Sequence, residues 1–202
     1  MNNIYIVSAH PNKDSLTASI VERVRAIARN LGFEAASCNL YDIGFDPVLS
    51  LQDMTNFRLE NEEDSTDRHS QLVEQQNLVK SSDILIFVYP VWWGGKPAIL
   101  KGWIDRVLSY GFAYSVVEGQ PVGLLQEKKA IEICTHGQSQ EEYSQNGMFS
   151  SMTTVANKGI FEFCGIETIG NLYYHDSTKD PSDVVQIDKI LDFVENDVLK
   201  LL

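Results

Sequence analysis

The chain has few basic residues, and this shortage excludes several kinds of partner. Its 16 Lys and Arg residues stand against 28 Asp and Glu residues, which gives a formal net charge of -12. No basic cluster interrupts this acidic balance. A protein with this charge repels nucleic-acid phosphates and anionic membrane surfaces. We therefore expect no nucleic-acid partner and no membrane insertion.

Cysteine is also scarce, and secretion signals are missing. The three cysteines, Cys38, Cys134 and Cys164, are far apart and lie in or beside apolar segments. Their spacing lacks the paired Cys or His pattern of metal sites, so we interpret them as buried residues of a reduced protein, with no metal. The amino terminus lacks the basic segment and long apolar stretch of a secretion signal. A cytoplasmic location is expected.

The 202 residues are 44% hydrophobic. That content can bury one substantial core, so we expect one domain over residues 1–202. Short apolar runs alternate with helical patterns five times, which predicts an α/β fold with an open, doubly wound parallel sheet and helices on both faces. The expected strands are Ile4–Val7, Glu34–Asn39, Ile84–Val88, Lys129–Cys134 and Glu167–Tyr173.

Helices are expected between these strands. Four of them run from Ser15 to Gly32, from Ser70 to Lys80, from Pro97 through Leu108 and from Ser150 to Phe163. The last helix is expected to begin with Asp180 as its N-cap and Pro181 as its first helical residue. The segments Tyr41–Gln52 and Tyr110–Gly123 read as irregular loops. The acidic run from Asp53 to Arg68 is typical of a solvated surface loop.

Ligands of such sheets bind outside the carboxyl ends of the strands, where three loops carry suitable residues. The first loop, His10 to Ser15, lacks both the dinucleotide fingerprint and the P-loop pattern. It places His10, Ser15 and the N–H groups of Leu16 and Thr17 at a helix amino terminus, which favours an anion such as phosphate. An ordinary capped helix with a surface histidine explains this loop equally well.

The second and third loops suit a flat ligand. Trp92 and Trp93 offer apolar faces beside the bare backbone of Gly94, although core or dimer contacts are an alternative for the tryptophans. In the third loop, Gly137 offers an N–H group, with His136 and Tyr143 as proton donors; for His136 alone, a satisfied loop histidine is the simpler interpretation. Together the loops predict a site for a planar, phosphorylated cofactor shaped like a flavin.

The longest distinctive run continues from the second loop as Pro90-Val91-Trp92-Trp93-Gly94-Gly95-Lys96-Pro97-Ala98-Ile99-Leu100-Lys101-Gly102-Trp103-Ile104-Asp105-Arg106-Val107, followed by Gly111-Phe112-Ala113-Tyr114. With Ala9-His10 and Ser15, the Thr135–Gly137 turn and Ile160–Gly165, it resembles the NAD(P)H:quinone oxidoreductase family, the DT-diaphorase-like flavoproteins. The resemblance covers nearly the whole chain. It implies a flavodoxin-like three-layer α/β/α sandwich with a five-stranded parallel sheet.

The resemblance also implies roles for individual residues. His10, Ser15, Leu16 and Thr17 would hold the flavin phosphates. Pro90, Val91, Trp93 and Gly94 would line the isoalloxazine, with Trp92 the weaker candidate, and Thr135 and Gly137 would face its N1 and O2 side. Family members are usually homodimers with shared active sites, in which Phe112, Tyr114 and Phe163 match the nicotinamide and quinone pocket.

Two departures from the family concern the proton-handling residues. The turn reads Thr135-His136-Gly137 where the family has Thr-Gly-Gly, and Tyr143 stands one residue later than in the mammalian enzymes. The histidine that partners this tyrosine has no counterpart, because the region reads Gln145-Asn146-Gly147-Met148. His136 is the candidate replacement, so Tyr143, His136 and Gly137 are the expected catalytic residues.

The expected activity is a flavin-dependent NAD(P)H:quinone oxidoreductase with ping-pong hydride transfer to a quinone or a similar flat acceptor. FAD is the expected cofactor, with Arg58 meeting its diphosphate, and FMN is the alternative. A regulatory or ancillary flavoprotein subunit with little turnover is a second hypothesis. A one-electron flavodoxin is disfavoured, because the double tryptophan and Phe112 to Tyr114 look like a substrate pocket.

Overall fold

The computed structural model describes residues 3–54, 67–175, 177 and 183–202. Five strands form one parallel sheet: β1 (Asn3–Ser8), β2 (Glu34–Asn39), β3 (Ile84–Pro90), β6 (Lys129–Thr135) and β7 (Glu167–Tyr174). Their order in the sheet is β2-β1-β3-β6-β7. All five predicted strands are confirmed, and so is the prediction of a five-stranded parallel sheet.

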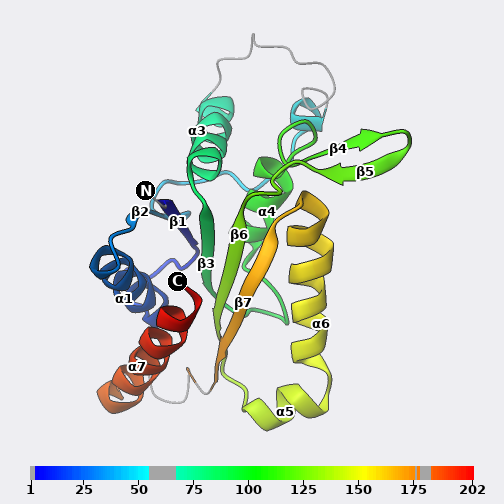
Figure 1. The fold of residues 1–202 in the computed structure, drawn as a ribbon. Helices are drawn as coiled ribbons and strands as arrows, with labels where there is room; N and C mark the ends of the chain where they lie inside the picture. The colour runs from blue at the N-terminus through cyan, green and yellow to red at the C-terminus, as the bar shows by residue number, and fades with distance from the viewer. Residues whose placement is uncertain (1–2, 55–66, 176, 178–182) are drawn as a thin grey trace.

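Helices cover both faces of the sheet, so the three-layer prediction is also confirmed (Figure 1). On one face lie α1 (Leu16–Asn30) and α7 (Val184–Leu201), which pack against each other. On the other lie α3 (Asp67–Ser81), α4 (Ala98–Val107) and α6 (Met148–Thr154). Each face has its own apolar cluster, because strand side chains alternate between the two sides.

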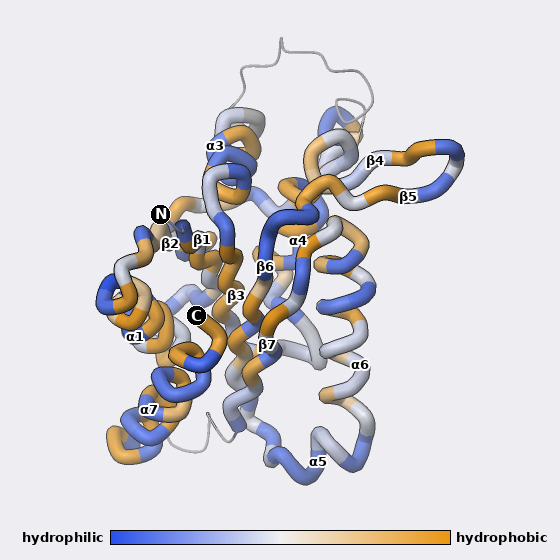
Figure 2. The backbone as a smooth tube through the Cα atoms, viewed as in Figure 1, coloured by the Kyte–Doolittle hydropathy of each residue, from blue (hydrophilic) through white to orange (hydrophobic). Residues whose placement is uncertain are grey.

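The middle of the sheet is buried on both faces, which is why β3 reads as an uninterrupted apolar run. Its residues from Ile84 to Tyr89 are all buried. The central strands are accordingly among the most hydrophobic parts of the tube in Figure 2. This burial is typical of parallel sheets and fixes the strand ends that carry the three predicted loops.

The segment Tyr110–Gly123, predicted as a loop, instead contains an antiparallel hairpin. Strand β4 (Tyr114–Val117) pairs with β5 (Gln120–Gly123), and the hairpin projects from the body of the molecule (Figure 1). Its turn has positive φ at both Glu118 and Gly119, as a two-residue hairpin turn requires. Pro121 obscured the strand in the sequence, since proline is tolerated only at sheet edges.

The helix predicted from Ser150 to Phe163 is also more complex than expected. A short helix, α5 (Gln140–Gln145), comes first, and Gly147, with φ of 76°, separates it from α6. A π-helix, η1 (Val155–Phe161), and a 3-10 turn, η2 (Glu162–Cys164), then extend α6. The early start was missed because Ser139 and Glu142 form a capping box in a segment with few apolar residues.

The ends of two other helices differ from the predictions. Asp183 caps α7 by accepting a hydrogen bond from the Gln186 N–H, whereas the predicted cap, Asp180, lies outside the described residues. Leu31, which follows the last residue of α1, and Val184, the first residue of α7, are exposed. Within the described ranges, no helix combines the length and apolarity that crossing a bilayer requires.

Candidate functional site

Three loops meet at the carboxyl ends of neighbouring strands β1, β3 and β6. The Ala9 N–H donates to the Val88 carbonyl (3.2 Å), and the Val91 N–H donates to the Thr135 carbonyl (2.8 Å). These bonds continue the ladder past the strand ends and hold the loops side by side. Because strand order reverses at β1, this is also the position where open α/β sheets bind ligands.

The first loop is fixed around His10. The Asn39 amide donates to the His10 carbonyl (3.0 Å), and the His10 N–H donates to Asn39 Oδ1 (3.3 Å). His10 Nδ1 lies 3.0 Å from the Asn12 N and 3.1 Å from the Asn12 carbonyl oxygen, so the tautomer of His10 decides which of these two contacts is a hydrogen bond. Asn12 and Asn39 were missed from the sequence, although Asn39 ends a predicted strand.

Helix α1 begins directly after this loop. Ser15 is its N-cap and accepts a hydrogen bond from the Ala18 N–H (3.2 Å). Leu16 and Thr17 occupy the first turn, where N–H groups have no acceptor within the helix, and this turn holds no acidic residue. A cavity of about 320 Å³ adjoins it, lined by Ser8, His10, Asn12, Lys13, Ser15, Thr17, Ala18, Val21, Glu22, Ser37, Cys38, Asn39 and Asp42. The N–H groups of such a helix amino terminus favour an anion.

The second loop is a tight hairpin from Trp92 to Gly95. The N–H of each of these residues donates to the carbonyl of the other, at 3.0 and 3.1 Å. The two central residues have positive φ, 52° at Trp93 and 72° at Gly94, as in type I′ turns. Trp93 is fully exposed, whereas Trp92 is partly covered, with its ring 6.1 Å from that of His10. A bulky residue is thus held in a conformation that L residues rarely adopt.

Replacing Trp93 with asparagine is expected to raise the free energy of unfolding by about 1 kcal/mol, because asparagine tolerates positive φ and no burial is lost. Chemical denaturation measures the change. Trp92→Asn is the matched control: Trp92 has negative φ and is partly buried, so this variant is expected to lose stability. If the free energy of unfolding fell as much in Trp93→Asn as in the control, the assignment of strain to this turn would be wrong.

The third loop places His136 and Tyr143 ring against ring. Their centroids are 4.4 Å apart and their planes differ by 22°. His136 is buried, Tyr143 is half-buried, and Gly137 between them in sequence is exposed. An open cavity of about 700 Å³ brings this loop together with the second one; its lining is Trp93, Gly94, Gln138, Glu142, Tyr143, Gln145, Asn146 and Met148. The two loops therefore share one binding surface.

A further histidine, His175, lies beside His136 and was missed from the sequence. Its Nδ1 is 2.7 Å from His136 Nε2. Strand β7 pairs with β6 in a register that sets Thr135 opposite Tyr174, so the residues that follow both strands become neighbours. The signal available in the sequence was a histidine just past the predicted end of a strand.

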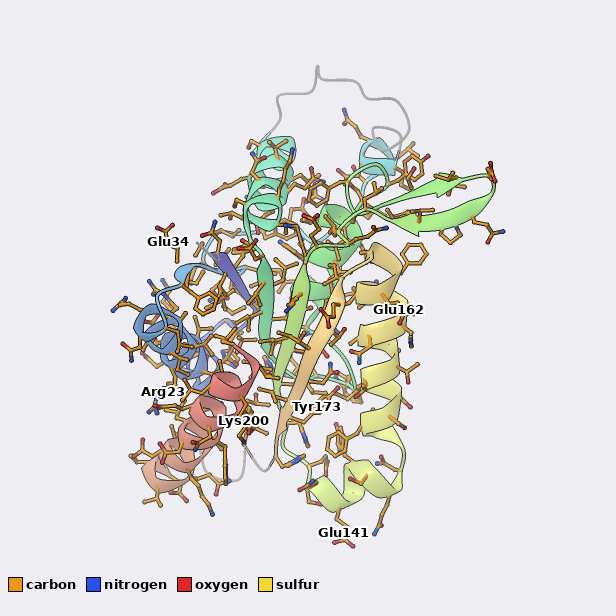
Figure 3. All side chains as sticks on the ribbon, viewed as in Figure 1. Arg23, Glu34, Glu141, Glu162, Tyr173 and Lys200 are labelled. Carbon is orange, nitrogen blue, oxygen red and sulfur yellow. The ribbon has the colours of Figure 1, made fainter. Side chains whose placement is uncertain are left out.

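The predicted pocket residues Phe112, Tyr114 and Phe163 lie elsewhere. The Tyr114 and Phe163 rings are 4.9 Å apart, close to the amino ends of the sheet strands. Figure 1 shows β4 and α5 at opposite ends of the molecule, and Figure 3 shows the same separation between Glu162, next to Phe163, and Glu141 of α5. One chain therefore does not bring these aromatic residues to the three loops. Arg58, the predicted diphosphate contact, lies outside the described residues.

Two cysteines are buried with raised thiol pKa values, and the third, Cys38, lines the cavity beside α1. Burial raises the pKa of the Cys164 thiol to about 11 and raises the pKa of Cys134, which also lies near the Glu132 carboxylate. Cys38 is only half-buried, less than predicted. Within the described part of the chain, no group of three or more His, Cys, Asp and Glu side chains could hold a metal ion.

Comparison with known proteins gives matches along nearly the whole chain. Residues 2–193 match the family described by its flavodoxin-like fold. An NAD(P)H oxidoreductase of Haemophilus influenzae is 34% identical over 170 residues, 84% of this chain and 81% of that protein. NAD(P)H dehydrogenase [quinone] 1 of Cavia porcellus is 34% identical over 178 residues, but this match covers only 65% of that protein.

Solved structures agree with these matches. The NAD(P)H:quinone oxidoreductase from Methanothermobacter marburgensis superposes with a TM-score of 0.84 at 25% identity, covering 96% of both chains.

Proposed function

Because the chain belongs to the flavodoxin-like fold family that includes NAD(P)H oxidoreductases, we propose that it is a flavin-dependent NAD(P)H:quinone oxidoreductase. One observation carries the proposal most directly. Trp93 is fully exposed in a strained turn, in the wall of the same open cavity as Tyr143. A flat ligand stacked there explains why the strain is retained, since such strain gathers at functional sites.

The residues present fit a flavin. The α1 amino terminus, with Ser15, Leu16, Thr17 and the ring of His10, would hold the phosphate. Pro90, Val91, Trp93 and Gly94 line the ring, with Trp92 at its margin, and the bare backbone at Gly94 allows close approach. Thr135 and Gly137 would face the opposite edge of the ring, and Tyr143 lines the same cavity as Trp93 and Gly94.

A bound flavin would supply the chemistry of hydride transfer from NAD(P)H to a quinone or similar flat acceptor. The protein's part is to orient both substrates in the open cavity, one after the other. The Gly137 N–H and the Tyr143 hydroxyl would act as hydrogen-bond donors toward negative charge at the edge of the ring that they face. Because both substrates use one cavity, ping-pong kinetics are expected.

FAD is the proposed form of the cofactor. The cavity of about 320 Å³ beside the phosphate site extends from α1 to the end of β2, where Ser37, Cys38 and Asn39 line it. This space supports a cofactor that continues beyond its first phosphate. Mass identification of the flavin released from purified protein distinguishes FAD from FMN.

Single-turnover reduction tests the activity itself. Anaerobic NADPH is expected to bleach the flavin absorption, and a quinone added afterwards is expected to restore it; NADH is tested alongside. Steady-state double-reciprocal plots are expected to be parallel. A bound flavin that stays oxidised would sink the enzyme proposal and favour a regulatory or ancillary flavoprotein.

The proposal includes a homodimer, because the pocket is incomplete in one chain. Phe112, Tyr114 and Phe163 lie at the opposite end from the three loops, so a second copy is needed to bring them there. The surface around them is suited to burial: the exposed apolar residues on the hairpin and on η1 and η2 include Val116, Val117, Leu124, Val155 and Phe163. Figure 2 shows hydrophobic residues on both strands of the projecting hairpin.

Mixing two defective variants tests the shared site. Trp93→Asn and Phe163→Ala are each expected to lose most quinone turnover, yet random dimers of the two should regain about a quarter of wild-type turnover, since half are mixed and each mixed dimer keeps one intact site. The variants are unfolded and refolded together, with each refolded alone as control. A monomer in sedimentation, or no recovery on mixing, would contradict the composite site.

A further inference from the structure

The His136 and His175 rings form a contact that the proposed function does not yet use. The ladder between β6 and β7 continues past their ends, because the His136 N–H donates to the Tyr174 carbonyl (3.0 Å). The Ser177 N–H then donates to the His136 carbonyl (3.1 Å). The backbone on both sides of the pair is therefore fixed. Its ring nitrogens, His136 Nε2 and His175 Nδ1, are 2.7 Å apart.

Aromatic rings enclose the two imidazoles. Tyr143 stacks on His136, and Phe149 lies 5.6 Å from His136 and 5.2 Å from His175, measured between ring centroids. His136 is almost fully buried. The pair thus sits directly behind the tyrosine that lines the open cavity, in surroundings where a charge is poorly screened by water.

Titratable side chains near the pair come from α5 and β7. On α5, Tyr143 stacks on His136, and the carboxylate of Glu142, the residue before it, accepts hydrogen bonds from the N–H and the hydroxyl of Ser139. On β7, burial raises the pKa of Tyr173, which keeps its hydroxyl neutral near pH 7.

The short distance between the nitrogens limits how many protons the pair can hold. A hydrogen bond between them needs one nitrogen as donor and the other as acceptor, so a single hydrogen lies between the rings. In the neutral pair a second hydrogen sits on the outer nitrogen of the ring that accepts this bond. A further proton goes to the remaining outer nitrogen, His136 Nδ1 or His175 Nε2, and gives the pair one positive charge. One more would set two N–H groups against each other. The two rings therefore titrate as one coupled unit.

We propose that His175 is a positioning residue that fixes the ring of His136, and that the pair holds the single proton consumed in quinone reduction. This inference rests on the proposed function. The conversion of a quinone to a hydroquinone takes up one hydride and one proton. The hydride comes from NAD(P)H, and the proton enters the pair from solvent at an outer nitrogen and is passed on toward the acceptor in the cavity.

Two substitutions at His175 separate this role from packing. His175→Phe keeps an aromatic ring but removes the hydrogen bond to His136. His175→Asn keeps a donor near the position of Nδ1 but cannot take a proton. Phe149→Leu is the matched control, because it changes the same ring cluster and leaves the pair intact.

The first measurement needs no turnover. In ¹⁵N NMR of the apoprotein, the two rings are expected to take up one proton together as the pH falls, with coupled shifts at both residues. In His175→Phe, His136 should titrate alone and with a different midpoint. Two independent titrations in the wild type would overturn the proposal.

The second measurement is the pH profile of the half-reaction with quinone. His175→Phe is expected to slow it by about 10-fold to 100-fold, and His175→Asn should recover part of the rate with a flatter profile, while flavin affinity stays within about threefold. An unchanged profile in His175→Phe, or an equal loss in Phe149→Leu, would overturn the role. If no flavin binds, the proposed function fails, but the NMR titration still decides the coupling.

Discussion

Replacing Asp53 with alanine is expected to lower the free energy of unfolding by about 3–5 kcal/mol, because it leaves the buried guanidinium of Arg106 without a counter-charge. Arg106 is fully buried; its Nε and Nη2 donate to the Asp53 carboxylate at 3.1 and 3.3 Å. Its Nη1 donates to the Asp46 carbonyl at 2.5 Å. The arginine therefore anchors the segment after β2 to helix α4. Urea denaturation measures the loss.

The double variant Asp53→Ala with Arg106→Met is the control. Removing both charges also removes the uncompensated one, so much of the loss should be recovered. A single Asp53→Ala variant within about 1 kcal/mol of the wild type would contradict the importance of the pair.

The same ion pair predicts a dependence on pH. Burial alone would raise the pKa of Asp53, but hydrogen bonds from Arg106 and Ser50 outweigh it and hold that pKa below its ordinary value. A carboxylate with a depressed folded pKa stabilises the protein above its unfolded pKa, about 4, and this contribution is lost as pH falls through the folded value. The double variant lacks the Asp53 carboxylate. As the pH falls from about 4 through the folded pKa of Asp53, it should therefore lose less stability than the wild type.

A comparable loss, about 3–5 kcal/mol, is expected when Lys96 is replaced by methionine, because Glu132 would remain charged and buried. The Lys96 ammonium lies 2.5 Å from Glu132 Oε1, and both side chains are largely buried. The Asn171 amide donates to the second carboxylate oxygen at 3.3 Å. The pair ties the end of the Trp92–Gly95 hairpin to strand β6.

Two further variants define this second prediction. Lys96→Met with Glu132→Leu replaces both charges by apolar groups and is expected to restore most of the stability. Lys101→Met removes an exposed lysine whose partner is Asp105, and should cost at most about 0.5 kcal/mol. Equal losses at Lys96 and Lys101 would count against a buried pair. Flavin affinity, followed in the same variants, reports whether the hairpin has moved.

The parts of the fold that follow from sequence are those with a repeated apolar pattern. The apolar run from Ile84 to Tyr89 predicts a buried central strand, and Ser15 predicts the start of α1. The hairpin β4–β5 was not predicted, because its strands are four residues each and Pro121 argues against a strand. The change from α-helix to π-helix between α6 and η1 was likewise not predicted, because the apolar residues keep a helical spacing across it.

The site divides in the same way. Loops at strand ends can be located once the strands are known, so His10, Trp93 and Tyr143 were identified from sequence alone. Their roles remain predictions. The contact between His136 and His175 depends on β7 lying next to β6, and the separation of Tyr114 from the loops depends on which end of the sheet the hairpin joins. Neither follows from local sequence.

The strained Trp92–Gly95 turn also gives the protein an intrinsic optical probe. The exposed fraction is 106% for Trp93, 39% for Trp92 and 0% for Trp103. Trp93 therefore contributes the long-wavelength part of the tryptophan emission, and a flavin stacked on it would quench that part first. The wavelength of the lost emission would then locate the bound ring on this turn without any attached label.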